Sequence, residues 1–299
     1  MTAPIPVLQA DVFTDRPFAG NPAAAVLDAD GLDAPAMQRI AGEMAVPGTA
    51  FVSASSRPDA DWALRMFTPR REVGYSGHTS LCGTHALIEA GRLPGPRVTF
   101  DTPSGLLRVE VERDGAGALM WLEPALPTCT PLDGGAVEIL DALGLPRAGL
   151  AGWARPAVTP DADLLLPVRD LATLRAIEPD MRRLAALRTA QQGRGVCVVS
   201  RETVDPGSST HSRFFAPHYG LPEDIVTGSV HTALGVWLLE AGALLVVDGR
   251  AVFTAEQGDG LGRPGRIRVE LTVTGGRASR ARVGGRAVTV LSGSLRPGG

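Results

Sequence analysis

The apolar residues of this chain alternate with polar ones in several short runs, and two longer segments are apolar almost throughout. The alternation in LLRVEVE (106–112) and RIRVELTV (266–273) has the period of two that is typical of β-strands. The longer segments, LCGTHALIEA (81–90) and TALGVWLLEA (232–241), carry apolar side chains nearly all round a helix. This pattern predicts two helices that are buried on every side, as helices enclosed by a sheet would be.

A repeat relates the two halves of the chain. Residues 76–91 (SGHTSLCGTHALIEAG) and 227–242 (TGSVHTALGVWLLEAG) align at one offset of 151 residues (227 − 76), and RMFTP (65–69) resembles RFFAP (213–217) upstream. In each half, a helix-like segment and an apolar strand precede the central helix, and strands follow it. The sequence therefore predicts a duplicated α+β fold.

The boundary between the halves is expected in the proline-rich segment EPALPTCTPLDGG (123–135). We expect residues 1–125 to form the N-terminal half, joined by a C-terminal strand within 280–299. Residues 126–279 are expected to form the C-terminal half.

Composition narrows the functional classes. The chain has 299 residues and a net charge of −3, and it has no basic cluster, so nucleic acid is not expected as a partner. All 29 basic residues are arginine, which excludes Schiff-base chemistry on a lysine. The three cysteines match no metal-binding spacing, and neither a signal peptide nor a membrane span is indicated. We therefore expect a cytoplasmic protein without a metal site.

Glycine-containing turns stand at the start of both central helices, SGH at 76–78 and TGS at 227–229. Glycine lets backbone and ligand approach closely, and the first N–H groups of a helix have no partner within the helix. Because these groups attract anions, two such ends facing each other would form a cleft. The expected occupant is a substrate carboxylate.

Four stretches carry a resemblance that runs over nearly the whole chain. They are DVFTDRPFAGNPAAAVL (11–27), FTPRREVGYSGHTSLCGTHAL (67–87), FFAPHYGLPEDIVTGSVHTALG (214–235) and FTAEQGDGLGRPGRIRV (253–269). Together they resemble the PhzF (phenazine biosynthesis-like) family. The resemblance implies the diaminopimelate epimerase-like fold, in which two barrel-like sheets each surround a central helix and the active site lies between them. It also implies that no cofactor or metal is used, and that the chain forms a homodimer.

The resemblance implies site residues as well. His78 corresponds to the histidine of the family's first Gly-His. Asp224 and Ser229 correspond to the aspartate and serine of an EDPATGS-like stretch, which reads EDIVTGS here. Gly77 and Gly228 correspond to the glycines whose backbone lines the cleft.

Four further residues complete the expected substrate-binding set. Asn21, in FAGNP, matches a family stretch near the site, and Tyr75 borders the site; a turn role for Asn21 and a packing role for Tyr75 stay open. Ser76 and Thr227 stand where racemases of the wider superfamily carry paired cysteines. Because neither hydroxyl is a base at neutral pH without an activator, a two-thiol racemase is not expected.

One position departs from the family pattern. The family's proton-moving glutamate lies in a SETTF-like loop after the first helix, and this chain reads PGTAF, with Gly48 in that place. Glu43, five residues earlier, is expected inside the helix and to point elsewhere. His78 is then the best acid–base candidate by its intrinsic pKa, and Asp224 could orient it or act itself. Capping or packing roles for His78 and Asp224 are the structural alternatives.

We expect structural roles, not catalytic ones, for the other histidines and for two glutamates. His85 and His231 are expected in the core, and His211 and His218 on the surface or in loops. Glu72 and Glu223, which match each other in the repeat, are expected to form salt bridges.

The sequence therefore predicts a cofactor-independent isomerase that relocates a proton or double bond in a small unsaturated carboxylic acid. The specific expectation is antibiotic biosynthesis, with a pyrroline carboxylate precursor of a 4-alkyl-L-proline as substrate. Two alternatives stay open. One is a catalytically silent relative that binds a small acid or a protein partner, which Gly48 favours. The other is a hydroxyproline-type epimerase or dehydratase with Ser76 or Thr227 as proton relay.

Overall fold

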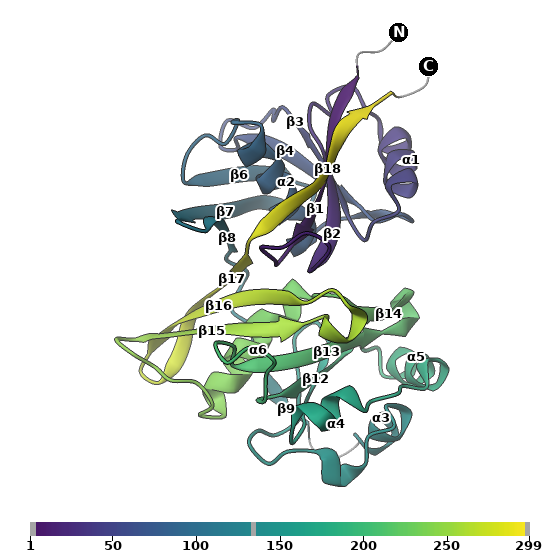
Figure 1. Ribbon diagram of the computed structural model, residues 1–299, viewed down its shortest axis with the longest axis vertical. Coiled ribbons are helices and arrows are strands. Elements are labelled where there is room, and N and C mark those ends of the chain that lie inside the picture. The colour runs from purple at the N-terminus through teal and green to yellow at the C-terminus, as the bar shows by residue number, and fades with distance from the viewer. Residues whose placement is uncertain (1–3, 133–135, 297–299) are drawn as a thin grey trace. The chain divides into compact units, whose positions relative to one another are not determined.

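The structure, a computed structural model, describes residues 4–132 and 136–296. Residues 133–135, at the end of the segment expected to join the two halves, lie outside the described residues. The chain divides into two compact units. The first unit is Met1–Glu123 with Gly284–Gly299, and the second is Pro124–Val283. Figure 1 labels most of the helices and strands of both units.

The first unit is built on a mixed β-sheet. Its elements are β1 Ile5–Val12, β2 Asn21–Val26, α1 Ala34–Met44, β3 Thr49–Ser53, β4 Trp62–Phe67, β5 Glu72–Val73, α2 Gly77–Glu89, β6 Arg97–Thr102, β7 Gly105–Asp114, β8 Gly117–Leu122 and β18 Ala287–Leu295. Neighbouring strands pair in the order β18, β1, β2, β3, β4, β6, β7, β8. The β2–β3 and β4–β6 pairs are parallel and the others are antiparallel. The first and last strands of the chain, β1 and β18, thus lie side by side (Figure 1).

Helix α1 covers one face of this sheet. Asp33 begins the helix by accepting a hydrogen bond from Ala36 N at 2.8 Å, which satisfies one of the first helical N–H groups. The helix buries Met37 against Phe51 and Phe67 of the sheet. Glu43 lies in α1 and is exposed, as the sequence predicted.

Helix α2 packs on the other face and is buried all round. Every residue from Thr79 to Leu87 is buried. A Cβ atom at Gly83 would lie 3.4 Å from Ala50 and 3.5 Å from Leu64, so the helix backbone lies close against β3 and β4. The prediction of a helix that is buried on every side is confirmed here, and likewise for α6 (Gly228–Glu240), where Val230–Leu238 are all buried.

The second unit repeats the strand order of the first. Its elements are β9 Thr130–Pro131, α3 Val137–Ala142, η1 Arg147–Gly149, β10 Ala157–Val158, β11 Leu164–Pro167, α4 Leu171–Arg175, α5 Met181–Ala190, β12 Val196–Ser200, β13 Thr210–Ala216, η2 Pro217–Tyr219, β14 Leu221–Asp224, α6, β15 Arg250–Gln257, η3 Asp259–Leu261, β16 Gly265–Thr274 and β17 Arg277–Gly285. The β11–β12 and β13–β15 pairs are parallel, and β12–β13 and β15–β16 are antiparallel. The same alternation links β2, β3, β4, β6 and β7 in the first unit.

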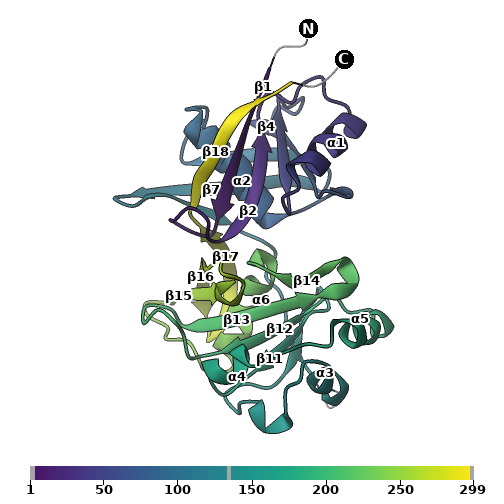
Figure 2. The same cartoon turned by 45° about the vertical axis from the view of Figure 1, so that its right-hand side comes forward.

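The sheet of the second unit also lies between helices. Figure 2 shows α3 and α5 side by side along β11 and β12. Their side chains join Val196 and Val198 of β12 in a buried apolar cluster. On the opposite face of the sheet, Ser212 of β13 lies 3.5 Å from His231 of α6. Both units therefore place the repeated helix on the face opposite the connecting helices.

An ion pair recurs at matching strands of the two units. Arg65 of β4 donates to Glu72 of β5 at 2.7 and 2.8 Å. Arg213 of β13 donates to Glu223 of β14 at 2.8 and 2.9 Å. The predicted salt bridges of Glu72 and Glu223 are confirmed.

All-round burial of the central helices has a measurable consequence for stability. Leu81 in α2 and Leu234 in α6 are both 0% exposed. Truncation of either to alanine should lower the free energy of unfolding by about 2–5 kcal/mol, because the cavity cannot open to water. Urea denaturation of Leu81→Ala and Leu234→Ala measures this loss.

Leu245→Ala is the matched control, since Leu245 is 81% exposed and should change stability by less than about 0.5 kcal/mol. Core variants that behave like this control would contradict the enclosed packing of the two helices.

Candidate functional site

The first turn of α2 gathers three polar side chains. Ser76 precedes the helix in an extended conformation (φ −155°, ψ 111°), and its side chain caps no backbone N–H group. Its Oγ lies 2.8 Å from Thr79 Oγ1 and 3.3 Å from His78 Nδ1. Thr79 Oγ1 in turn lies 3.5 Å from His78 Nε2. The half-buried imidazole therefore has a hydroxyl beside each ring nitrogen, at the N-terminal end of a helix.

Gly48 lies against this cluster. It is buried just before β3, and its carbonyl oxygen accepts a hydrogen bond from Ala24 N at 2.9 Å. A Cβ atom at residue 48 would overlap Thr79 Oγ1 and would stand 3.0 Å from His78 Nε2. The side chains of the first turn of α2 thus fill the space that a side chain at residue 48 would need.

Tyr75 and Asn21 differ in their relation to this turn. Tyr75 is 43% exposed, and its hydroxyl oxygen lies 3.6 Å from the point where a Cβ of Gly77 would stand. Asn21 is buried at the first position of β2, opposite Val12 of β1, and β2 packs against α2. Tyr75 therefore covers the start of the helix, whereas Asn21 belongs to the strand pair next to it.

In the second unit, one buried amide holds the turn before α6. Thr227 Oγ1 donates to Asp224 Oδ2 at 2.7 Å. The Gln257 side chain, which is fully buried, donates through Nε2 to Asp224 O at 2.9 Å and to Thr227 Oγ1 at 3.1 Å. Gln257 Oε1 accepts from Thr227 N at 3.3 Å. These contacts fix the direction in which the Asp224 carboxyl group points.

Gly228 and Ser229 begin α6 beside an ion pair between half-buried Arg194 and buried Asp163. Ser229 Oγ accepts a hydrogen bond from Arg194 Nη1 at 3.1 Å. Arg194 Nε donates to Asp163 Oδ1 at 2.9 Å, and Nη2 contacts Asp163 Oδ2. Burial raises the pKa of the Asp163 carboxyl group, and the hydrogen bonds and charge of Arg194 oppose that rise. The α6 end is thus rich in charged groups, whereas hydroxyls and an imidazole line the α2 end.

The two histidines inside the central helices are buried, as predicted. His231 Nδ1 lies 2.7 Å from Thr227 O, and Nε2 faces Ser212. Burial lowers the pKa of His231 to about 4, so this imidazole is neutral at pH 7 and donates from Nδ1 to the carbonyl oxygen. His85 Nε2 lies 2.9 Å from Thr289 Oγ1, and burial lowers its pKa as well. Both serve the packing of their helices.

The expectation that His211 lies on the surface or in a loop is wrong. His211 belongs to β13 and is 3% exposed. Its Nδ1 lies 2.7 Å from Oε2 of Glu256, a carboxylate that is itself fully buried. Burial alone would raise the pKa of Glu256, but hydrogen bonds from His211 and from two backbone N–H groups lower it to about 2. His211 is therefore buried because its ring pairs with the buried carboxylate of Glu256 on the neighbouring strand β15.

Four residues near the helix ends were not among the predicted site residues: Thr79, Asp163, Arg194 and Gln257. Thr79 follows His78 directly, and Gln257 lies in a stretch that carries the family resemblance. No sequence pattern pointed to Asp163 or Arg194. Arg194 lies 31 residues from Asp163 and 35 residues from Ser229 in the sequence, so only the fold brings them together. Among the described residues, 4–132 and 136–296, no group of three or more His, Cys, Asp or Glu side chains could hold a metal ion.

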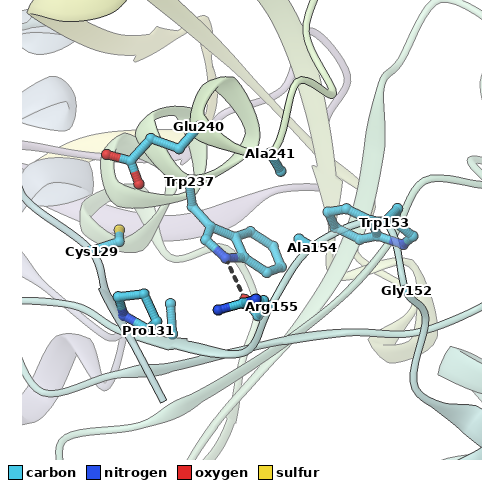
Figure 3. A pocket seen from close by; sticks show the side chains of 10 residues that line it. Cys129, Pro131, Gly152, Trp153, Ala154, Arg155, Trp237, Glu240 and Ala241 are labelled. Carbon is cyan, nitrogen blue, oxygen red and sulfur yellow. Dashed lines mark hydrogen bonds between the residues drawn. The ribbon is translucent and has the colours of Figure 1, made fainter. Parts of the chain in front are cut away.

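A cavity of about 350 Å³ lies at the other end of α6 (Figure 3). Trp153 and Trp237 line it with ring centroids 5.0 Å apart, and Trp237 Nε1 donates to Arg155 O at 2.8 Å. Burial raises the pKa of Cys129, another lining residue, to about 12, so its thiol is protonated and a poor nucleophile. A helix of 13 residues is about 20 Å long, which separates this cavity from the polar turn at the N-terminus.

Comparisons with known proteins place this geometry in a family context. Residues 10–293 match the family model described as phenazine biosynthesis-like protein, PhzC-PhzF. The chain is 36% identical over 290 residues to an uncharacterized isomerase of Deinococcus radiodurans, covering 94% of this chain and 91% of the relative. It is also 36% identical over 299 residues to an uncharacterized isomerase of Mesorhizobium japonicum, covering 95% and 96%.

Solved structures agree with these relatives. A PhzF family phenazine biosynthesis protein of Bacillus anthracis superposes with a TM-score of 0.88 at 27% identity, covering 99% of this chain and all (100%) of that one. A predicted epimerase of Pseudomonas aeruginosa gives a TM-score of 0.76 at 26% identity, covering 97% and 99%. A hydroxyproline epimerase of Agrobacterium vitis, at 17% identity, 98% and 92% coverage and a TM-score of 0.60, shares the fold alone. The fold is thus a mixed α/β fold with extensive sheet.

The buried neutral imidazole of His231 predicts a pH dependence of stability. Its folded pKa of about 4 lies below the ordinary 6.5, so the unfolded chain binds more protons between these values. The stabilisation is therefore present above about pH 6.5 and is lost as the pH falls towards 4. Urea unfolding of the second unit should show a loss of about 2 kcal/mol from this group between pH 7 and pH 5.

The comparison variant is His231→Gln, which cannot titrate. It should be less stable at pH 7 but should lack this part of the pH dependence. An equal pH dependence in both proteins would show that the folded-state pKa of His231 is not depressed.

Proposed function

Because this chain belongs to the phenazine biosynthesis-like (PhzC-PhzF) family of isomerases, we propose that it relocates a proton and a double bond in a small unsaturated carboxylic acid. No cofactor takes part in the proposed reaction. The chemistry rests on the imidazole of His78 in the first unit and the carboxyl group of Asp224 in the second. Ser76, Gly77 and Tyr75 on the first unit bind substrate in this proposal. Their counterparts on the second unit are Thr227, Gly228 and Ser229.

The observation that carries the proposal is how close the backbone of residue 48 lies to the His78 ring. The family resemblance implies a glutamate where this chain has Gly48, and we propose that the imidazole substitutes for that carboxylate. A Cβ at residue 48 would stand 3.0 Å from His78 Nε2, so a ring nitrogen lies next to where the missing side chain would begin. An imidazole has an ordinary pKa near neutrality and can both accept and return a proton.

The proposed step balances without an outside reagent. His78 removes a proton from the saturated carbon next to a double bond that is conjugated with the carboxylate. The C–H electron pair forms a new double bond, and the negative charge spreads towards the carboxylate oxygens. The N–H groups of the first turn of α2 favour that charge. His78 then returns the proton to a different carbon, which gives the isomer.

Asp224 has a defined orientation for a second role. Thr227 Oγ1 donates to one of its carboxyl oxygens at 2.7 Å, and Gln257 holds its backbone. We propose that Asp224 contacts the reacting part of the substrate as a proton acceptor or as a hydrogen-bond partner. Asn21, at the first position of β2, is the remaining residue that we propose for the substrate-binding set.

The wider assignment is also part of the proposal. We take the two units to be copies of one domain, each with a barrel-like sheet around its helix, because the order of parallel and antiparallel pairs recurs. We further propose a cytoplasmic homodimer that acts in specialised metabolism, such as antibiotic biosynthesis. A pyrroline carboxylate precursor of a 4-alkyl-L-proline is the candidate substrate that we would test first. In the described part of the chain, no helix is long and apolar enough to cross a membrane.

Deuterium incorporation tests the proposed chemistry. The protein is incubated in D₂O with 1-pyrroline-2-carboxylate or 2,4-hexadienoate, and NMR follows deuterium at each carbon. Wild type should accelerate exchange above the rate without protein for at least one acid. His78→Gln and Asp224→Asn should each reduce that acceleration at least about 100-fold, the lower range for loss of a general acid or base.

His218→Gln and Asp141→Asn are the controls, because both residues lie outside the proposed site, and they should keep wild-type rates. Exchange that survives both site variants would remove His78 and Asp224 from the mechanism. Acid binding without exchange in wild type would favour a silent binding protein. Exchange at one stereocentre with no shift of the double bond would favour an epimerase.

The filled space in front of residue 48 gives a separate prediction. Gly48→Ala should destabilise the first unit and lower activity, since its methyl group would overlap Thr79 Oγ1. In a Thr79→Ala background the same substitution should cost less, because the overlapping oxygen is gone. Thermal unfolding of the two single variants and the double variant measures the coupling. Additive effects would contradict a direct contact between these positions.

A further inference from the structure

We propose that Arg194 is a positioning residue that fixes the hydroxyl of Ser229 as a hydrogen-bond donor to a carboxylate oxygen of the substrate, an inference that rests on the proposed function. Arg194 lies in the segment before β12, and Ser229 lies in the first turn of α6. Their contact is the hydrogen bond from Arg194 Nη1 to Ser229 Oγ at 3.1 Å.

The direction of this hydrogen bond is not reversible. A guanidinium group has only donors, whereas a serine hydroxyl can donate one hydrogen bond and accept others. Because Ser229 Oγ accepts from Arg194, its own hydrogen is left to donate elsewhere. Ser229 is half-buried, so the residue is not closed off from solvent. A carboxylate oxygen of the substrate accepts hydrogen bonds, and the Ser229 hydroxyl can donate one.

Arg194 is itself held rigidly. Asp163, which is 0% exposed, accepts from the Nε and Nη2 sides of the guanidinium in a fork-like arrangement. Asp163 N donates to Thr159 Oγ1 at 3.1 Å, which fixes the aspartate in its turn. The guanidinium carbon also lies 5.7 Å from the centre of the Phe214 ring. The Nη1 group therefore has little freedom to leave Ser229.

The local charge argues against Arg194 as a direct carboxylate receptor. Asp163 is paired with it, and Asp161 Oδ2 lies 3.4 Å from Nη2. The negative charge of Asp224 acts on the same guanidinium. Three carboxylates thus already compensate the single positive charge of Arg194, so the guanidinium attracts a fourth carboxylate only weakly. Neutral donors, namely the Ser229 hydroxyl and the helix N–H groups, must supply the hydrogen bonds to an incoming acid.

A double-mutant cycle tests whether Arg194 acts through Ser229. The affinity for pyrrole-2-carboxylate, a planar unsaturated acid, is measured by calorimetry for wild type, Arg194→Lys, Ser229→Ala and the double variant. Lysine keeps the charge but cannot hold Asp163 and reach Ser229 at once. Each single variant should bind about five- to tenfold more weakly. The double variant should bind no more weakly than Ser229→Ala alone.

Arg282→Lys is the matched control. Arg282 Nη2 donates to Glu270 at 2.9 Å in the same unit, its side chain is 12% exposed, and it lies on β17. This variant should keep wild-type affinity. Unchanged affinity in Arg194→Lys would overturn the inference, as would losses that multiply in the double variant.

A ligand-free measurement separates this inference from the proposed function. Three-bond NMR couplings of Ser229 should report one side-chain rotamer in wild type and averaged rotamers in Arg194→Lys. If wild type binds no acid, the proposed function fails, and the couplings then decide the positioning of Ser229 by themselves. A Ser229 rotamer that is unchanged by Arg194→Lys overturns the inference in either case.

Discussion

The burial of α2 against the sheet of the first unit determines where the polar groups at the start of this helix lie. Because Thr79–Leu87 are all buried, the polar groups at the start of the helix must find partners within a small volume. Ser76, His78 and Thr79 turn towards one another, and the chain before β3 approaches them through a residue without a side chain. The position of the imidazole is therefore set by the packing of a whole helix and not by a flexible loop.

The second unit has the same order of strand pairs but different side chains at the start of its helix. Its helix begins at a turn that is tied to Asp224 and Gln257, and an arginine held by a buried aspartate contacts the first turn. The repeated strand order and the repeated Arg–Glu pairs concern the scaffold. The side chains at the two helix ends differ: hydroxyls and an imidazole lie at one, and charged groups lie at the other. Two units with the same order of strand pairs thus present different polar groups at their helix ends.

Much of this architecture follows from local sequence pattern. All-round apolar segments predicted the buried helices, and matching glutamates in the repeat predicted salt bridges at Glu72 and Glu223, although not their arginine partners. The pattern could not show that Thr79 fills the space beside Gly48, because that contact depends on how closely a strand approaches the helix. It gave no sign of the Arg194–Ser229 contact, and it misplaced His211, since partners that lie 35 and 45 residues away leave no periodic trace.

The central claim is that the imidazole of His78 moves the proton in place of a carboxylate at residue 48. The most direct measurement compares the pH at which the His78 ring ionises, followed by NMR of the imidazole carbons, with the pH dependence of deuterium incorporation into substrate. If His78 moves the proton, the rate changes at the pH where His78 titrates, and this change disappears in His78→Gln. A pH dependence of the rate that does not follow the ionisation of His78, or that persists in His78→Gln, would contradict this role of His78.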